Sequence, residues 1–150
     1  MKGQTLIETV LVGSIIAIIV SGISVLIVSS LSNAGFAKNQ SLATQHSQDG
    51  LEVLRSIRNS NYAVFAGYNN TYCLEKDAKT LDTATDCSSP NIDNVFIRTV
   101  LIEPNSCETN VSRATITVTW TDGKCSNGTF CHKSQLASCL STINPIKGIE

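Results

Sequence analysis

One acidic side chain, Glu8, lies inside an otherwise uncharged part of the chain. Residues 5–31 read TLIETVLVGSIIAIIVSGISVLIVSSL and carry Glu8 as their one charge, and residues 9–37 carry none. A carboxylate beside a long apolar run is costly unless it has a partner, which makes Glu8 a candidate functional group. The alternative is that Glu8 lies among lipid headgroups and stabilises a helix N-terminus through the macrodipole.

Cysteines are the second group of residues with a chemical role. All six follow the apolar segment: Cys73, Cys87, Cys107, Cys125, Cys131 and Cys139. An even number of cysteines in an exported region indicates three disulfides, although the count alone does not fix the pairing. The rival is a zinc site made from Cys125, Cys131 and His132, but their spacing lacks the short C-x-x-C clip of most structural sites. We therefore expect no metal.

Motifs for cofactor binding or catalysis are missing from the sequence. It contains no phosphate-binding glycine loop, no dinucleotide-binding turn, no H-E-x-x-H and no nucleophile elbow. The two histidines, His46 and His132, lie far apart in the sequence, and we expect both at the surface. We therefore expect a protein that is not an enzyme and that needs no cofactor.

Composition places a small domain behind an apolar segment. The chain has 150 residues, 11 Lys and Arg against 12 Asp and Glu, and 15% charged residues, where about 25% is usual. That balance excludes a broadly basic nucleic-acid binder. The apolar stretch exceeds the roughly 20 residues needed to span a bilayer and has no polar face, so we expect a transmembrane helix. A signal peptide fits less well, because its apolar core is shorter and its start more basic.

The first eight residues, Met1-Lys2-Gly3-Gln4-Thr5-Leu6-Ile7-Glu8, carry a family resemblance. This start resembles that of type IV prepilins and pseudopilins. The resemblance implies that residues 1–3 are a leader, that a prepilin peptidase cuts after Gly3, and that the new N-terminus at Gln4 is methylated. The chain departs from the family in having Gln4 where Phe is usual and no proline before Pro90.

The resemblance also implies how the protein assembles. Thr5 and Glu8 fall at assembly positions, with the Glu8 carboxylate pairing with the free amine of a neighbouring subunit's Gln4. The implied partners are the membrane, the peptidase and other pilin subunits. The protein would cross the inner or cytoplasmic membrane once, with its head outside the cytoplasm, and would then enter an extracellular filament.

Two other interpretations stay open. One is a minor pilin or pseudopilin with a ligand-binding head for adhesion, DNA uptake or protein secretion. DNA binding lacks support, because residues 61–150 hold 7 basic and 9 acidic residues. A basic patch for DNA would draw on Lys76, Lys79, Arg98, Arg113, Lys124 and Lys133. The other interpretation is an ordinary domain anchored by a single span.

The elements that position these residues follow from periodicity. Residues 4–31 are expected to form the transmembrane or filament-core helix, and residues 32–60 to continue it as an amphipathic helix. In that continuation Leu51, Leu54 and Ile57 form an apolar stripe, while Gly35 and Gly50 weaken the case for one unbroken helix.

Residues 61–150 are expected to form a disulfide-stapled head. Residues 61–94 are turn-rich and predict a long loop with little regular structure, the sheet spans residues 95–141, and residues 142–150 form a tail. Strands are expected at 95–103, 114–121 and 132–140. The middle one alternates, with Ala114, Ile116, Val118 and Trp120 on one face and four threonines on a solvent face.

The expected fold class is therefore α+β. A long N-terminal helix packs on a small antiparallel sheet of three to four strands, the pilin-like arrangement that the resemblance also implies.

The expected strand order ranks the cysteine pairings. Cys125 and Cys131 flank the connection between the second and third strands, so they can close it. In an up-down-up meander, Cys107 after the first strand and Cys139 near the end of the third lie at the same edge. Cys73 and Cys87 remain for the long loop.

Overall fold

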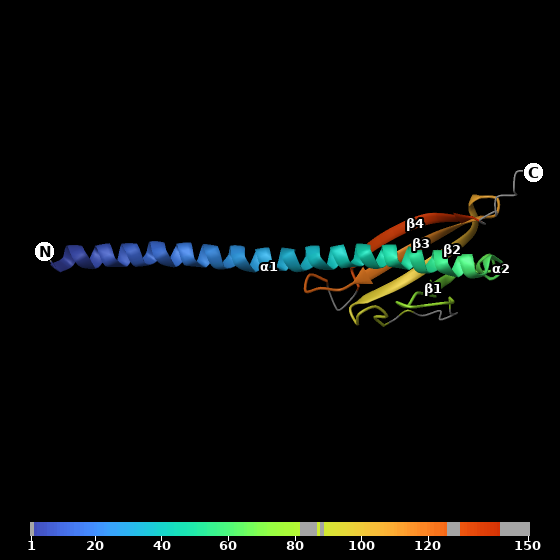
Figure 1. Ribbon diagram of the computed structural model, residues 1–150. Coiled ribbons are helices and arrows are strands. Elements are labelled where there is room, and N and C mark those ends of the chain that lie inside the picture. Colours follow the sequence, from blue (N-terminus) through green and yellow to red (C-terminus); the bar gives the residue numbers. More distant parts are fainter. Residues whose placement is uncertain (1, 82–86, 88, 126–129, 142–150) are drawn as a thin grey trace, which may run out of the picture. The chain divides into compact units, whose positions relative to one another are not determined.

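The computed structural model describes residues 2–81, 87, 89–125 and 130–141, with backbone alone for residues 2–6. The expected tail, residues 142–150, lies outside the described residues. The chain divides into two compact units, Met1–Lys38 and Asn39–Glu150. Helix α1 (Lys2–Ser60) contributes to both units, and each unit is considered by itself below (Figure 1).

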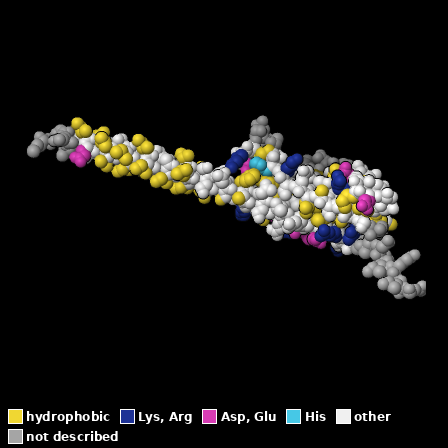
Figure 2. Space-filling model, turned by 90° about the horizontal axis from the view of Figure 1, so that it is seen from above, with side chains coloured by type: hydrophobic (Ala, Val, Ile, Leu, Met, Phe, Trp, Pro, Cys, Tyr) yellow, Lys and Arg dark blue, Asp and Glu magenta, His cyan; other side chains and the backbone are white. Residues whose placement is uncertain are grey.

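The first unit consists of the apolar part of α1. From Ile7 to Leu31 its large apolar side chains are exposed, between 48% for Ile15 and 71% for Ile18. Figure 2 shows apolar side chains gathered along this helix and charged side chains gathered on the second unit. The helix is long and apolar enough to cross a membrane.

Three serines of this apolar helix are hydrogen-bonded within it. Ser14 and Ser21 donate their hydroxyls to the carbonyls of Leu11 and Ile18, at 2.8 and 2.9 Å, and Ser24 donates to the carbonyl of Val20 at 2.9 Å. Hydroxyls bonded to the preceding turn do not need water, so these serines are compatible with an apolar surrounding.

The second unit contains one four-stranded antiparallel sheet in the order β1-β2-β3-β4. Its strands are β1 (Thr71–Cys73), β2 (Phe96–Glu108), β3 (Val111–Trp120) and β4 (His132–Ser141), and each pairs with the next in sequence. Residues 39–60 of α1 lie along one face of this sheet (Figure 1). The expected α+β class, with a long N-terminal helix on an antiparallel sheet, is confirmed.

The core lies between α1 and the inner face of the sheet. From β3 it takes Ala114, Ile116, Val118 and Trp120, all fully buried as their alternation predicts. The helix contributes its predicted stripe, Leu51, Leu54 and Ile57, each at most 8% exposed. The β3 threonines on the other face, expected in solvent, are half-buried.

Gly50 lets the helix approach the sheet closely. The helix continues through Gly35 and Gly50, so neither glycine breaks it. A Cβ placed on Gly50 would lie 3.2 Å from Cδ of Arg98 and 3.3 Å from Cγ2 of Ile116, tighter than ordinary contact. Gly50 is therefore used for close packing, at the modest cost of helix propensity that glycine carries.

The described part of residues 61–94 is mostly irregular, but it holds two short elements that the sequence did not indicate. This segment contains helix α2 (Tyr62–Phe65), capped by the Asn61 side chain, which accepts a hydrogen bond from the amide of Val64 at 3.2 Å. It also contains β1, which pairs with β2 from Thr71↔Leu101 to Cys73↔Thr99. A three-residue strand is too short to show alternation. Its pairing with β2 therefore identifies it as a strand, and its own sequence does not.

The first long strand also runs further than expected. β2 continues past residue 103 to Glu108, through Pro104, and its register against β3 shifts between Glu103 and Glu108. Proline and a change of register are typical of a bulged strand end. Cys107 consequently lies within β2 and not after it.

Candidate functional site

Glu8 is the one charged residue between Ile7 and Ala37, on a helix with apolar side chains all round. Its side chain is exposed, and within the described part of the chain it makes no ion pair. Gly3, Gln4 and Thr5 lie in the first turns of the same helix, and their side chains are outside the description. Gln4 and Glu8 are thus one helical turn apart along the backbone.

Three disulfides tie the second unit together, in the pairing that the strand order favours. Cys73 of β1 joins Cys87, Cys107 of β2 joins Cys139 of β4, and Cys125 joins Cys131, with Cα–Cα distances of 5.7, 6.2 and 5.6 Å. The second bond crosses over β3, which lies between its two strands. The third closes the connection between β3 and β4.

The residues of the rival zinc site do come together. Ligand atoms of Cys125, Cys131 and His132 all lie within 4.8 Å of one another. The two sulfurs are already bonded to each other, however, and a metal requires thiolates. Nε2 of His132 instead lies 3.0 Å from Oδ1 of Asp122, and this hydrogen bond lowers the pKa of the Asp122 carboxyl, helped by the backbone amide of Lys124.

Arg98, one of the residues that a basic patch for DNA would draw on, is not at the surface. Its side chain is 1% exposed and points from β2 into the core. Its guanidinium donates to three main-chain carbonyls in two segments: Nε to Leu74 at 2.9 Å and Nη2 to the adjacent Glu75, and Nη1 to His46 on α1 at 3.0 Å. Burial lowers the pKa of Arg98.

A signal for this burial was present in the sequence. Arg98 alternates with Phe96 and Val100 on one face of β2, and both of those neighbours are buried. The alternation that identifies the β3 core face thus also places Arg98 inside.

His46 was expected at the surface, and that prediction is wrong. It is 7% exposed on α1, with its ring centroid 5.2 Å from that of Phe96. Nε2 lies 3.5 Å from Oδ2 of Asp93, and Nδ1 lies 3.9 Å from Oδ2 of Asp49. Burial lowers the pKa of His46, opposed by Asp93 and Asp49 and assisted by the positive charges of Arg98 and Lys76.

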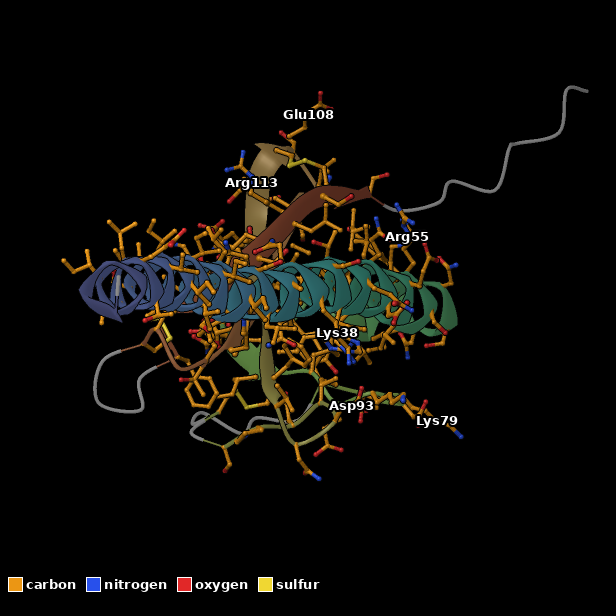
Figure 3. All side chains as sticks on the ribbon, turned by 90° about the vertical axis from the view of Figure 1, so that its left-hand side faces the viewer. Lys38, Arg55, Lys79, Asp93, Glu108 and Arg113 are labelled. Atoms are coloured by element: carbon orange, nitrogen blue, oxygen red, sulfur yellow. A yellow bond between two sulfur atoms is a disulfide. The ribbon has the colours of Figure 1, made fainter. Side chains whose placement is uncertain are left out.

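Three further basic side chains of the second unit do not converge. Arg55 projects from α1, Lys79 from the segment after β1 and Arg113 from β3, in different directions (Figure 3). Lys76 is 3.6 Å from Asp93, and Arg113 is the register partner of Glu103. A surface with opposite charges interspersed gives no cationic track for a phosphate backbone.

The described residues thus combine an apolar helix that carries one carboxylate with a disulfide-bonded unit. No family model, no curated protein and no solved structure matches this chain.

Proposed function

We propose that this protein is a structural subunit of a type IV pilus-like filament. A prepilin peptidase would remove residues 1–3, and the mature chain would polymerise through its N-terminal helix. One observation carries the proposal: α1 exposes large apolar side chains on all sides from Ile7 to Leu31, with Glu8 as its single charge. A contiguous apolar surface of this extent requires a partner.

A filament core answers that requirement better than a bilayer alone. A helix that only anchors a domain needs apolar side chains but has no use for a carboxylate in the span. In a bundle of neighbouring subunits, the apolar surface is covered on every side, and Glu8 pairs with the amine of a neighbour's Gln4. In a medium of low dielectric such a pair specifies register strongly, even where its net contribution to stability is modest.

The second unit supports the same proposal. Three disulfides in a unit of this size are typical of proteins in oxidising compartments, outside the cytoplasm. That location fits a head carried on a helix which first crosses the inner membrane once. The dispersed cations and the buried Arg98 give no support to a DNA-binding head.

The test is filament assembly by variants of Glu8. Glu8→Ala and Glu8→Gln remove the carboxylate, and Glu52→Ala removes another exposed glutamate of the same helix, which pairs with Arg55. An unpaired buried charge costs about 3–5 kcal/mol, so both Glu8 variants should reach the membrane normally but lose roughly a hundredfold or more in sheared filaments. Glu52→Ala should assemble like the wild type. Normal filaments from Glu8→Ala would refute the role of Glu8.

A further inference from the structure

Strand β4 forms a long, open edge of the sheet. It is last in the order β1-β2-β3-β4, and it pairs with β3 without interruption from Val111↔Ser141 to Trp120↔His132. Among the residues that the structure describes, no strand pairs with its other side. In an antiparallel strand, alternate residues direct their N–H and C=O groups to opposite sides, so about half of these groups point away from β3.

This edge lacks the features that usually keep sheet edges from pairing. Its sequence, HKSQLASCLS, contains no proline or glycine and a single charge, Lys133. Its register shows no bulge, whereas β2 contains both Pro104 and a register shift. Short length, charges, proline and bulges are the common protections of edge strands, and β4 has little of them.

The edge is also held rigid. The Cys107–Cys139 disulfide fixes β4 to β2 across β3, and the Cys125–Cys131 disulfide closes the connection that leads into β4. Near its end, the carbonyl of Ser141 accepts a hydrogen bond from Nη1 of Arg58 at 3.4 Å. A strand already held in ladder geometry loses little conformational freedom when another strand joins it.

The inner face of β4 is left incompletely covered. Its neighbours across the register in β3, Ile116 and Val118, are fully buried, while Leu136 and Ser134 are half-buried. A further strand beside β4 would cover these side chains. The edge thus offers both unpaired main-chain groups and a partly exposed apolar side chain.

We propose that β4 pairs, edge to edge and antiparallel, with β4 of a second copy of this chain, so that two four-stranded sheets join into one. The sequence of β4 is compatible with itself in this arrangement. With Leu136 on the twofold axis, Ser134 of each copy faces Ser138 of the other, and all these side chains lie on the inner face. Lys133 faces Cys139 of the other copy, so the two lysines are far apart and do not repel each other.

Twofold symmetry defines where this contact belongs. It joins two copies that face in opposite directions. It therefore links two copies that do not span one membrane in the same direction, such as subunits of two neighbouring filaments, and not successive subunits of one polar filament. It requires neither cleavage after Gly3 nor Glu8, so it stands apart from the proposed function.

The test is thiol crosslinking of the full-length chain in a nonionic detergent, which lets two copies face in opposite directions, with a short bismaleimide. Ala137→Cys is exposed on β4, and the pairing brings its two copies within about 8 Å. Lys133→Cys is equally exposed on the same strand, but the pairing separates its copies by about 20 Å. Emission from the buried Trp120 checks that both variants are folded.

We expect a crosslinked dimer as the main product of Ala137→Cys, with the two chains joined through the substituted position of each copy, and loss of that dimer with Lys133→Cys. Equal crosslinking by both variants, which random collision or parallel pairing would give, overturns the proposal. So does capture of a different protein by Ala137→Cys, or no crosslink at all.

Discussion

Removing each disulfide in turn should destabilise the second unit to a different and calculable extent. The change is a double substitution to alanine, one pair at a time, so that no free thiol remains. None of the six cysteines is fully buried, so little packing is lost with the sulfurs. The main loss is the restriction that each crosslink places on the unfolded chain, which grows with the length of the closed loop.

The sequence separations set the order of the effects. They are 32 residues for Cys107–Cys139, 14 for Cys73–Cys87 and 6 for Cys125–Cys131. The loop-closure relation converts these separations into about 3.7, 3.0 and 2.2 kcal/mol at 25 °C. Because the free energy of unfolding of small domains is only about 5–15 kcal/mol, the loss of Cys107–Cys139 removes a large share of the stability.

The assay is urea denaturation of the full chain in a nonionic detergent, followed by tryptophan emission. Trp120 is the one tryptophan of the sequence and is fully buried in the core, so it reports on the second unit alone. The Cys107 and Cys139 double variant should have the lowest midpoint, and the Cys125 and Cys131 variant the highest of the three. The reverse order, or a loss below about 1 kcal/mol for Cys107–Cys139, would refute the loop-closure reasoning.

Three further predictions concern the contact between α1 and the sheet. Gly50→Leu should cost about 1–3 kcal/mol by overpacking, measured by urea denaturation, whereas Gly35→Leu, where nothing lies within 4 Å, should not. Arg98→Met should lower the free energy of unfolding by about 1–3 kcal/mol in the same assay, because the carbonyl of Leu74 loses its hydrogen-bond donor. An unchanged free energy of unfolding would contradict this and show that the carbonyl has another donor. Since burial lowers the pKa of His46, the unfolded chain binds a proton that the folded chain does not, so stability should fall as pH decreases through about 6.5, by at most about 1.4 kcal/mol per pH unit. The urea midpoint of His46→Gln should not fall with pH in this way. If its pH dependence equals that of the wild type, His46 is not the group responsible.

The parts of the fold that repeat a pattern were predictable from the sequence. The alternation over residues 114–121 identifies β3 and its buried face, and the spacing of Leu51, Leu54 and Ile57 identifies the buried face of the helix. The disulfide pairing follows because the order of the strands limits which cysteines can meet.

Other features depend on tertiary contacts that no local pattern encodes. β1 exists as a strand because β2 offers it an edge, and its three residues alone show no periodicity. Gly50 is typical of a helix breaker in the sequence, and its use in close packing emerges only when Arg98 and Ile116 lie opposite it. His46 lies inside because Phe96 and Asp93, about 50 residues away in the sequence, cover it.

Processing of the N-terminus tests the filament proposal most directly. The full chain is expressed with and without a prepilin peptidase, and the mass of its N-terminal peptide is measured. The proposal predicts a chain that begins at Gln4 when the peptidase is present and at Met1 when it is absent. A chain that keeps Met1 in both cases, or a cut beyond Leu31, would contradict it and leave an anchored or secreted disulfide-bonded domain in its place.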